Sequence, residues 1–248
     1  MPCSEPAVAT MSASGSFTAS VADPAALVAA VQRADSALGL LQATQALAAS
    51  AHPDGAACLV EVLGFNNPGA AVAAVDGLIA IGEPAVATIL ANLDADNYGA
   101  RAWAVRALAG IGDVRGLEVL EDALGRDIGP SVRRAAARGL GQLRLFGLAP
   151  EHRRATAERC LQALVDGCRD GEWVVRYAVA VGLESLAPAL HPDHAGGHEP
   201  IQRLTGALGG LHRNPGEEAP VVRLRAALAL ERLGAPVGGS EEGGCGDG

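Results

Sequence analysis

The chain has 248 residues, of which 49% are hydrophobic and only 3% aromatic, so we expect a core of mostly small and aliphatic side chains. The net charge of −9 argues against a nucleic-acid binder, which needs clustered cations to displace counterions from phosphates, and favours a basic or neutral protein partner. All 19 basic residues are arginine, which excludes a Schiff base on the enzyme's own lysine and a phosphate loop that uses lysine.

The two ends of the chain differ in composition from the rest. The first twenty residues are small and polar, without the basic region and apolar block of a secretory signal or the length of a membrane span. The last eleven residues are mainly Gly and Glu. They have few apolar side chains whose burial could offset the chain entropy that is lost on folding. We therefore predict disorder over residues 1–22 and 236–248, one folded array over residues 23–235, no membrane span and a cytoplasmic location.

The cysteines are odd in number and scattered, and none forms a close pair with the spacing of a zinc site: Cys3, Cys58, Cys160, Cys168 and Cys245. Free thiols in a reducing compartment are therefore expected. His191, His194 and His198 share a Gly/Pro loop that could hold a metal, but nothing in the loop fixes a ligand geometry. We expect no metal site.

Between the ends, six Ala-rich segments carry a leucine at the same point. These marker leucines are Leu47, Leu78, Leu108, Leu140, Leu183 and Leu230. Their spacing is about thirty residues at first and grows toward the C-terminus, a periodicity typical of stacked helical repeats. The pattern predicts an all-α protein, an α-solenoid of HEAT-like helix pairs.

Residues 98–124 show how one unit is built. A helix ending near Ile111 is followed by a Gly-Asp break and a second helix with leucines on one face, and Gly112 suits the C-cap because a positive φ costs glycine nothing. The break from Ile81 to Pro84 shows the same pattern, a glycine after one helix and then the start of the next, with proline in its first turn. The residues eight, four and one before each marker and three after it are apolar or glycine in the last four units, which predicts the buried seam.

An arginine stands seven residues before the marker in four units, at Arg101, Arg133, Arg176 and Arg223. Six positions before these arginines stand Asp127, Asp170 and Glu217, and Asp94 and Asp96 flank the same point in the first of the four units. We interpret the pattern as a structural ladder, in which each arginine bridges to acids or loop carbonyls at the turn between repeats. The longer connections, from Arg144 to Thr156 and from Ala187 to Gly197, either contact a partner or are passive loops.

Aromatic and arginine side chains gather at positions off the seam, which would face the concave side of such an array. They are Tyr98, Trp103, Arg106, Arg134, Arg138, Trp173 and Tyr177, with Asp76 from the unit before. Aromatic faces beside guanidinium groups suit a flat conjugated ligand that bears carboxylates. In the alternative interpretation the indoles only pack between units and the arginines are a solvated face. Asp76 would either pair with Arg106 or accept hydrogen bonds from a ligand's N–H groups.

Four stretches carry a resemblance to a known family. They are residues 64–78, with Gly-Phe-Asn-Asn-Pro at the start, residues 96–108, with Asp-Asn-Tyr-Gly-Ala-Arg-Ala-Trp, and the Val-Arg motifs of residues 131–141 and 172–178. Over about residues 25–190 the chain resembles the F subunit of the heterodimeric E/F-type phycocyanobilin lyases, which are built from HEAT-like repeats.

The resemblance implies an enzyme subunit that acts with an E-type partner. Such a pair adds a cysteine thiol of the phycocyanin α-subunit to the ethylidene group of phycocyanobilin and forms a thioether; the bilin is a substrate and no cofactor is implied. On this basis Asp76 and Arg106 are the expected catalytic residues, with Asp76 on the pyrrole N–H groups. Arg106, Arg134 and Arg138 would hold propionates, and the aromatic residues would stack on the pigment.

Related lyase-isomerases carry an Asn-His-Cys-Gln-Gly-Asn hexapeptide that this sequence lacks, so ligation without isomerisation is expected. The alternatives are a non-catalytic HEAT-repeat adaptor or chaperone for phycobiliproteins and a scaffold without pigment.

Overall fold

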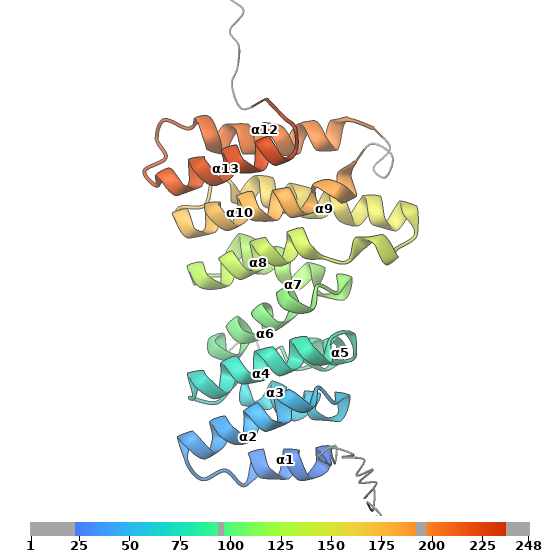
Figure 1. Ribbon diagram of the computed structural model, residues 1–248, viewed down its shortest axis with the longest axis vertical. Helices are drawn as coiled ribbons and strands as arrows, with labels where there is room; N and C mark the ends of the chain where they lie inside the picture. The colour runs from blue at the N-terminus through green and yellow to red at the C-terminus, as the bar shows by residue number, and fades with distance from the viewer. Residues whose placement is uncertain (1–22, 94–96, 192–196, 237–248) are drawn as a thin grey trace, which may run out of the picture.

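The computed structural model describes residues 23–93, 97–191 and 197–236, and within these ranges every regular element is a helix. The α-helices form pairs along the chain: α1 (Pro24–Gln32) with α2 (Ala37–Ser50), α3 (Ala56–Val62) with α4 (Pro68–Ile81), α5 (Glu83–Ala91) with α6 (Tyr98–Ile111), α7 (Leu117–Arg126) with α8 (Pro130–Gln142), α9 (Pro150–Gly167) with α10 (Trp173–Leu186), and α12 (Glu199–Arg213) with α13 (Pro220–Arg232). Figure 1 shows the pairs stacked in chain order from one end of the molecule to the other. The predicted α-solenoid is confirmed.

The pairs form two layers (Figure 1). The second helices, α2, α4, α6, α8, α10 and α13, pack each on the next and make what we call the B layer. The first helices, α1, α3, α5, α7, α9 and α12, make the A layer behind it. All six marker leucines lie in the B layer and none is more than 2% exposed, so the periodic leucine does mark the buried seam.

Side chains and glycines set the ends of the B helices. The side-chain oxygens of Ser36, Asn67 and Asn97 accept hydrogen bonds from backbone N–H groups in the first turns of α2, α4 and α6, at 3.0–3.1 Å. At the other end of α6, Gly112 has a φ of 69°, a conformation that glycine adopts without strain. The local sequence therefore marks where α2, α4 and α6 begin, whereas α8, α10 and α13 begin without a side-chain cap.

Small residues let neighbouring B helices approach closely. A Cβ atom on Gly182 of α10 would lie 2.4 Å from the carbonyl oxygen of Ala137 in α8, and a Cβ on Gly141 would lie 2.3 Å from the Gly182 carbonyl oxygen. Gly139 meets Ala109 of α6 in the same way. The backbones of α8 and α10 are thus in direct contact, which no larger residue would allow.

Both insertions contain regular structure. Residues 145–147 form a 3₁₀ turn, η3 (Leu145–Gly147), and the rest of the insertion begins α9, an 18-residue helix. The second insertion continues α10 into η4 (Ala187–Leu190), whose Leu190 is buried; residues 192–196, with His194 among them, lie outside the described residues. Residues 1–22 and 237–248 also lie outside them.

One window, Trp173–Leu190, has the length and hydropathy of a membrane span. Over half of it, 56%, is buried inside the stack, where α10 packs between α8 and α13. This burial is what a core helix of the solenoid requires.

Candidate functional site

The exposed apolar side chains are not evenly distributed over the helices. Among the described residues, the large hydrophobic side chains that are exposed on α-helices all belong to the B layer: Leu38, Val72, Ile79, Tyr98, Trp173, Tyr177, Val221, Leu224 and Leu228. The described A helices expose no large hydrophobic side chain. We call the solvent side of α4, α6, α8 and α10 the B face; it carries all eight predicted site residues. The B face is therefore the candidate binding surface.

Trp103, Arg106 and Arg134 form the centre of the B face. The guanidinium of Arg106 lies over the Trp103 indole, 4.4 Å from the ring centroid, a cation–π contact between residues three apart on α6. Burial, and then the charge of Arg134 on the neighbouring helix α8, lower the pKa of Arg106. Within the described residues neither Arg106 nor Arg134 makes an ion pair. The guanidinium groups of Arg106 and Arg134 therefore stand close enough to repel each other. A bound carboxylate would reduce this repulsion.

A pocket of about 270 Å³ opens beside Trp103, at the N-terminal ends of α4 and α6. It is lined by Phe65 and Asn66 of the loop before α4, by the cap residues Asn67 and Asn97, and by the Trp103 indole. The two cap residues use their side-chain oxygens on the helices, and Asn67 also donates its amide to the carbonyl of Ala37. The pocket thus combines two aromatic faces with amide groups, and sequence reasoning gave Phe65 and Asn97 no role although both belong to the quoted motifs.

The remaining predicted site residues are placed on the B face without joining this centre. Asp76 on α4 is exposed and makes no ion pair with Arg106 among the described residues, because the Arg106 side chain lies on Trp103 instead. Tyr98 is 60% exposed at the start of α6, and Trp173 and Tyr177 are 47% and 38% exposed in the first turns of α10. Arg138 is exposed on α8, one turn beyond Arg134. The face therefore offers stacking surfaces on both sides of the arginines.

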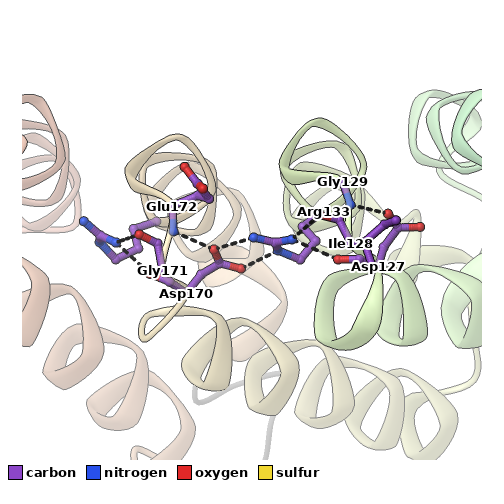
Figure 2. Close-up of polar contacts among 8 residues, drawn as sticks. Asp127, Ile128, Gly129, Arg133, Asp170, Gly171 and Glu172 are labelled. Atoms are coloured by element: carbon purple, nitrogen blue, oxygen red, sulfur yellow. Dashed lines mark hydrogen bonds and ion pairs between the residues drawn. The ribbon is translucent and has the colours of Figure 1, made fainter.

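The predicted arginine ladder is present at two of its four arginines, which make the same set of contacts (Figure 2). Arg133 donates to the backbone carbonyls of Asp127 and Ile128 in its own loop, and its guanidinium binds both carboxylate oxygens of Asp170 in the next loop, at 2.7 and 3.0 Å. Arg176 repeats the arrangement one unit later, with the carbonyls of Asp170 and Gly171 and the carboxylate of Glu217. Asp170 and Glu217 are thus each bound by the arginine of the preceding unit, whereas Asp127 accepts a hydrogen bond from the N–H of Gly129 in its own loop.

The first and the last arginine of the ladder, Arg101 and Arg223, do not make the contacts that the sequence predicts. Arg101 pairs with Asp122 of α7 at 2.5 Å, a helix residue rather than a loop acid, and Asp94 and Asp96 lie outside the described residues. Arg223 bridges nothing: within the described residues its side chain makes no hydrogen bond or ion pair. The physical reason is its place in the last helix, α13, after which no further described loop could supply the acid.

The described cysteines are unsuited to nucleophilic catalysis. Cys58 and Cys160 are buried and Cys168 is half-buried; burial raises the pKa of Cys160 and of Cys168 to about 12. Thiols in this state stay protonated at neutral pH and are poor nucleophiles. Among the described residues, no three His, Cys, Asp or Glu side chains are grouped to hold a metal ion.

A second pocket lies in the A layer, and most of the charged side chains that line it are acidic. It measures about 350 Å³ between α7 and α9, and Glu121, Asp166 and Asp170 line it with Arg169. Its excess of carboxylates disfavours a ligand that itself bears carboxylates. For such a ligand the B face is the electrostatically suitable surface.

These features define the class of protein as a HEAT-repeat α-solenoid with an aromatic and cationic face. The family model for HEAT repeats matches residues 88–184. The "Phycobilisome maturation protein" of Synechococcus elongatus is 47% identical over 85% of this chain and 98% of its own length. The "Phycocyanin alpha phycocyanobilin lyase CpcF" of Synechocystis sp. is 53% identical over 65% of this chain and 75% of its own. The chain belongs to the family of phycocyanobilin lyase subunits.

A solved structure agrees with this assignment. A chain in the structure of "the complex of CpcE and CpcF of phycocyanin lyase" from Nostoc sp. superimposes with a TM-score of 0.64 at 39% sequence identity. The match covers 72% of this chain and 99% of that one. A designed armadillo repeat protein, 20% identical with a TM-score of 0.51, shares the solenoid fold alone.

Proposed function

We propose that this chain is the F-type subunit of a heterodimeric bilin lyase, which attaches phycocyanobilin to a cysteine of the phycocyanin α-subunit. The relatives named as phycocyanobilin lyase subunits and the CpcE–CpcF complex support the activity and the E-type partner. The compartment that the proposal implies is the cytoplasm, where reducing conditions keep the acceptor cysteine free.

The centre of the B face carries the assignment of the bilin site. The observation is the Arg106 guanidinium stacked on Trp103 beside Arg134, with no carboxylate paired to either arginine among the described residues. A bilin is flat, conjugated and bears two propionates, so an indole, an aromatic pocket and two unpaired guanidinium groups match its parts. Arg138 extends the cationic surface, and Tyr98, Trp173 and Tyr177 offer further stacking surfaces.

The reaction requires that the enzyme position the bilin for the acceptor thiolate. It does not require a nucleophile from the enzyme itself. The acceptor thiolate attacks the ethylidene carbon, a C–S bond forms, the electron pair moves into the conjugated system, and a proton is taken up there. No group leaves and no electrons are transferred to another molecule. Holding the bilin in place, with Asp76 available to the pyrrole N–H groups, lowers the barrier chiefly by orientation and electrostatics. Neither a cofactor nor a metal is required by this scheme.

The test is co-expression of the chain with an E-type subunit, the enzymes that make phycocyanobilin, and the apo α-subunit of phycocyanin. We expect a zinc-fluorescent, acid-stable adduct on the α-subunit. Arg106→Ala and Asp76→Ala should each lower the yield of adduct, Arg106→Ala by roughly 10- to 100-fold for the loss of a charge-assisted contact of about 1.5–3 kcal/mol. Arg126→Ala, an exposed arginine of the A layer, is the matched control.

The outcomes separate the three candidate functions. Pigment that binds this chain but never reaches the α-subunit identifies an adaptor, and no pigment on either protein identifies a scaffold. Wild-type transfer by both the Arg106 and the Asp76 variants would leave the lyase activity standing and refute this placement of the site.

A further inference from the structure

The pocket beside Trp103 is too small for a whole tetrapyrrole. Its volume is about 270 Å³, whereas a pocket that encloses a drug-sized ligand has roughly 300–1,000 Å³. Phe65, from the loop before α4, and Trp103, on α6, line it with aromatic surface, and both side chains stay partly exposed. The space therefore fits one ring of a bilin, with the rest of the molecule outside on the B face.

The described lining of this pocket carries no charge. It consists of three asparagines, with apolar residues and glycines for the rest. The two guanidinium groups lie outside it, with Arg106 over the Trp103 ring and Arg134 on α8. A propionate finds its counter-charge on these arginines, and it would be left without one in the pocket. Because the two inner rings of a bilin bear the propionates, the ring that enters the pocket is one of the two outer rings.

One amide group is placed to bind the polar edge of such a ring. The side-chain oxygen of Asn97 accepts the N–H of Ala100 at 3.0 Å, as the cap of α6. Its amide nitrogen makes no hydrogen bond with any described residue, and a Cβ atom on Gly64 would lie 3.4 Å from it. Asn67, by contrast, has both its oxygen and its nitrogen bound. Each outer ring of a bilin is a lactam, whose carbonyl oxygen accepts a hydrogen bond from an amide N–H of this kind.

The ring in the pocket cannot be the ring that reacts. The acceptor cysteine belongs to another folded protein, and its thiolate has to come within about 3–3.5 Å of the ethylidene carbon. A ring seated against Phe65, Trp103 and the loop before α4 is partly enclosed, so a side chain of a second protein could not approach it so closely. The ring with the ethylidene group therefore lies outside the pocket, beyond the arginines, where Trp173 and Tyr177 on α10 are exposed.

We propose that the pocket beside Trp103 binds the outer ring that carries the ethyl group, with the Asn97 amide donating to its lactam carbonyl, and so determines which end of the bilin faces the acceptor cysteine. The inference rests on the proposed function for the identity of the ligand. Phe65 and Asn97 thereby set the orientation of the substrate, and neither takes part in the bond-forming step.

The experiment compares two bilins that share the ethylidene ring and carry either the natural ethyl group or a methyl group on the other outer ring. The affinity of the complete complex with the E-type subunit is measured for each by fluorescence titration, and adduct formation on the apo α-subunit is followed in parallel. The wild-type complex should bind the methyl compound about fourfold more weakly, as expected for the loss of one buried CH₂ group.

Variants on the aromatic walls test the position of the ethyl group. Phe65→Ala should weaken the binding of the ethyl compound and abolish the preference for it, because the wall that packs on the ethyl group is gone. Trp173→Ala should weaken the binding of both compounds and leave the preference intact. Circular dichroism verifies that each variant is folded.

Two further variants test the polar edge and the size of the pocket. Asn97→Ser keeps a capping oxygen and should lower the affinity for both bilins by about threefold to tenfold, since only the hydrogen bond to the lactam is lost. Gly64→Ala meets its neighbours at ordinary contact distance and narrows the pocket, so it should shift the preference toward the methyl compound. Gly125→Ala on α7, where a Cβ meets nothing within 4 Å, is the matched control and should behave like the wild type.

The outcomes separate this inference from the proposed function. If the wild-type complex neither binds bilin nor forms adduct, the proposed function is wrong and the orientation falls with it. If the wild type forms adduct but shows no preference for the ethyl compound, or if Phe65→Ala keeps the preference, only the placement of the ring is wrong. Loss of the preference in Trp173→Ala instead would put the ethyl-bearing ring on α10 and reverse the proposed orientation.

Discussion

The contact between Arg176 and Glu217 is the most buried ion pair of the ladder. The Glu217 side chain has no exposed surface, and that of Arg176 is 16% exposed. Removing one partner leaves a buried charge without compensation, so we expect Arg176→Met or Glu217→Gln to lower the free energy of unfolding by about 3 kcal/mol. Urea titration followed by circular dichroism measures the change.

The control for this prediction is an ion pair in solvent. Arg126 is 84% exposed where it meets Asp122 four residues earlier on α7, and Arg126→Met should cost no more than about 0.5 kcal/mol. Equal losses for the two arginines would show that the ladder is not a special source of stability.

The same buried carboxylates make stability depend on pH. The hydrogen bonds from Arg176 hold the pKa of Glu217 below its usual range; for Asp170 burial acts upward, but hydrogen bonds from Arg133 and from the N–H of Glu172 outweigh it, so that pKa is lowered too. A carboxyl group with a folded-state pKa below its unfolded-state pKa stabilises the fold fully above about pH 4.3, and the stabilisation is lost as the pH falls through the folded-state value.

We therefore expect the melting temperature to fall steeply between pH 4.5 and the onset of acid unfolding, over roughly two pH units. In Glu217→Gln one of the titrating groups is gone, so the fall should be shallower. Thermal melts of both proteins over this range provide the measurement, and parallel curves would contradict the assignment.

At the residue scale, the sequence predicts the contacts of two ladder arginines, Arg133 and Arg176, but not those of Arg101 and Arg223. The spacing of seven before the marker leucine depends only on the helix period, so Arg133 and Arg176 could be identified. Whether Arg101 finds a loop acid or Asp122 depends on the packing of α7, which no local pattern encodes. Likewise Arg106 could lie on Trp103 or reach toward Asp76, and only the packed side chains decide between them.

At the scale of elements, Gly182 allows a direct backbone contact between α8 and α10. Because a Cβ on Gly182 would collide with the backbone carbonyl of Ala137, Gly182→Ala must push the helices apart, at a cost of about 1–3 kcal/mol. Gly206 on α12 has open space around its Cα, so Gly206→Ala should stabilise the chain by about 0.5–1 kcal/mol through helix propensity. Chemical unfolding of the two variants should give shifts of opposite sign; a stabilising Gly182→Ala would disprove the close contact.

The elements themselves were the most predictable part of the fold. Breaks such as Gly82 before Pro84 and Gly112 before Asp113 carry their own turn chemistry, so helix pairs can be located from local sequence. The sequence did not predict the structure inside the two insertions: α9 begins at Pro150 within the first, and η4 lies within the second with Leu190 buried against neighbouring pairs. The pocket beside Trp103 was missed for a related reason, since Phe65 and Asn97 lie in different repeats and meet only when α4 and α6 stack.

At the scale of the whole molecule, the two layers of the stack differ in what they expose. The A helices α7 and α12 present charged residues to solvent, whereas every helix of the B layer except α8 exposes at least one large apolar or aromatic side chain. A solenoid keeps such a face accessible because each pair packs only on its neighbours, and the core is completed without the B face. Fold stability and the binding surface are therefore separable, which is why the site variants above should remain folded.

The nearest-neighbour architecture also predicts how the stack opens. The pair of α9 and α10 has neighbours on both sides and includes the closest backbone contact, with α8, whereas α13 has a neighbour on one side only. Local opening should therefore cost least at the end, and hydrogen exchange monitored by mass spectrometry should show α13 exchanging faster than α8 and α10. Uniform exchange along the stack would mean that the six described pairs unfold as one unit.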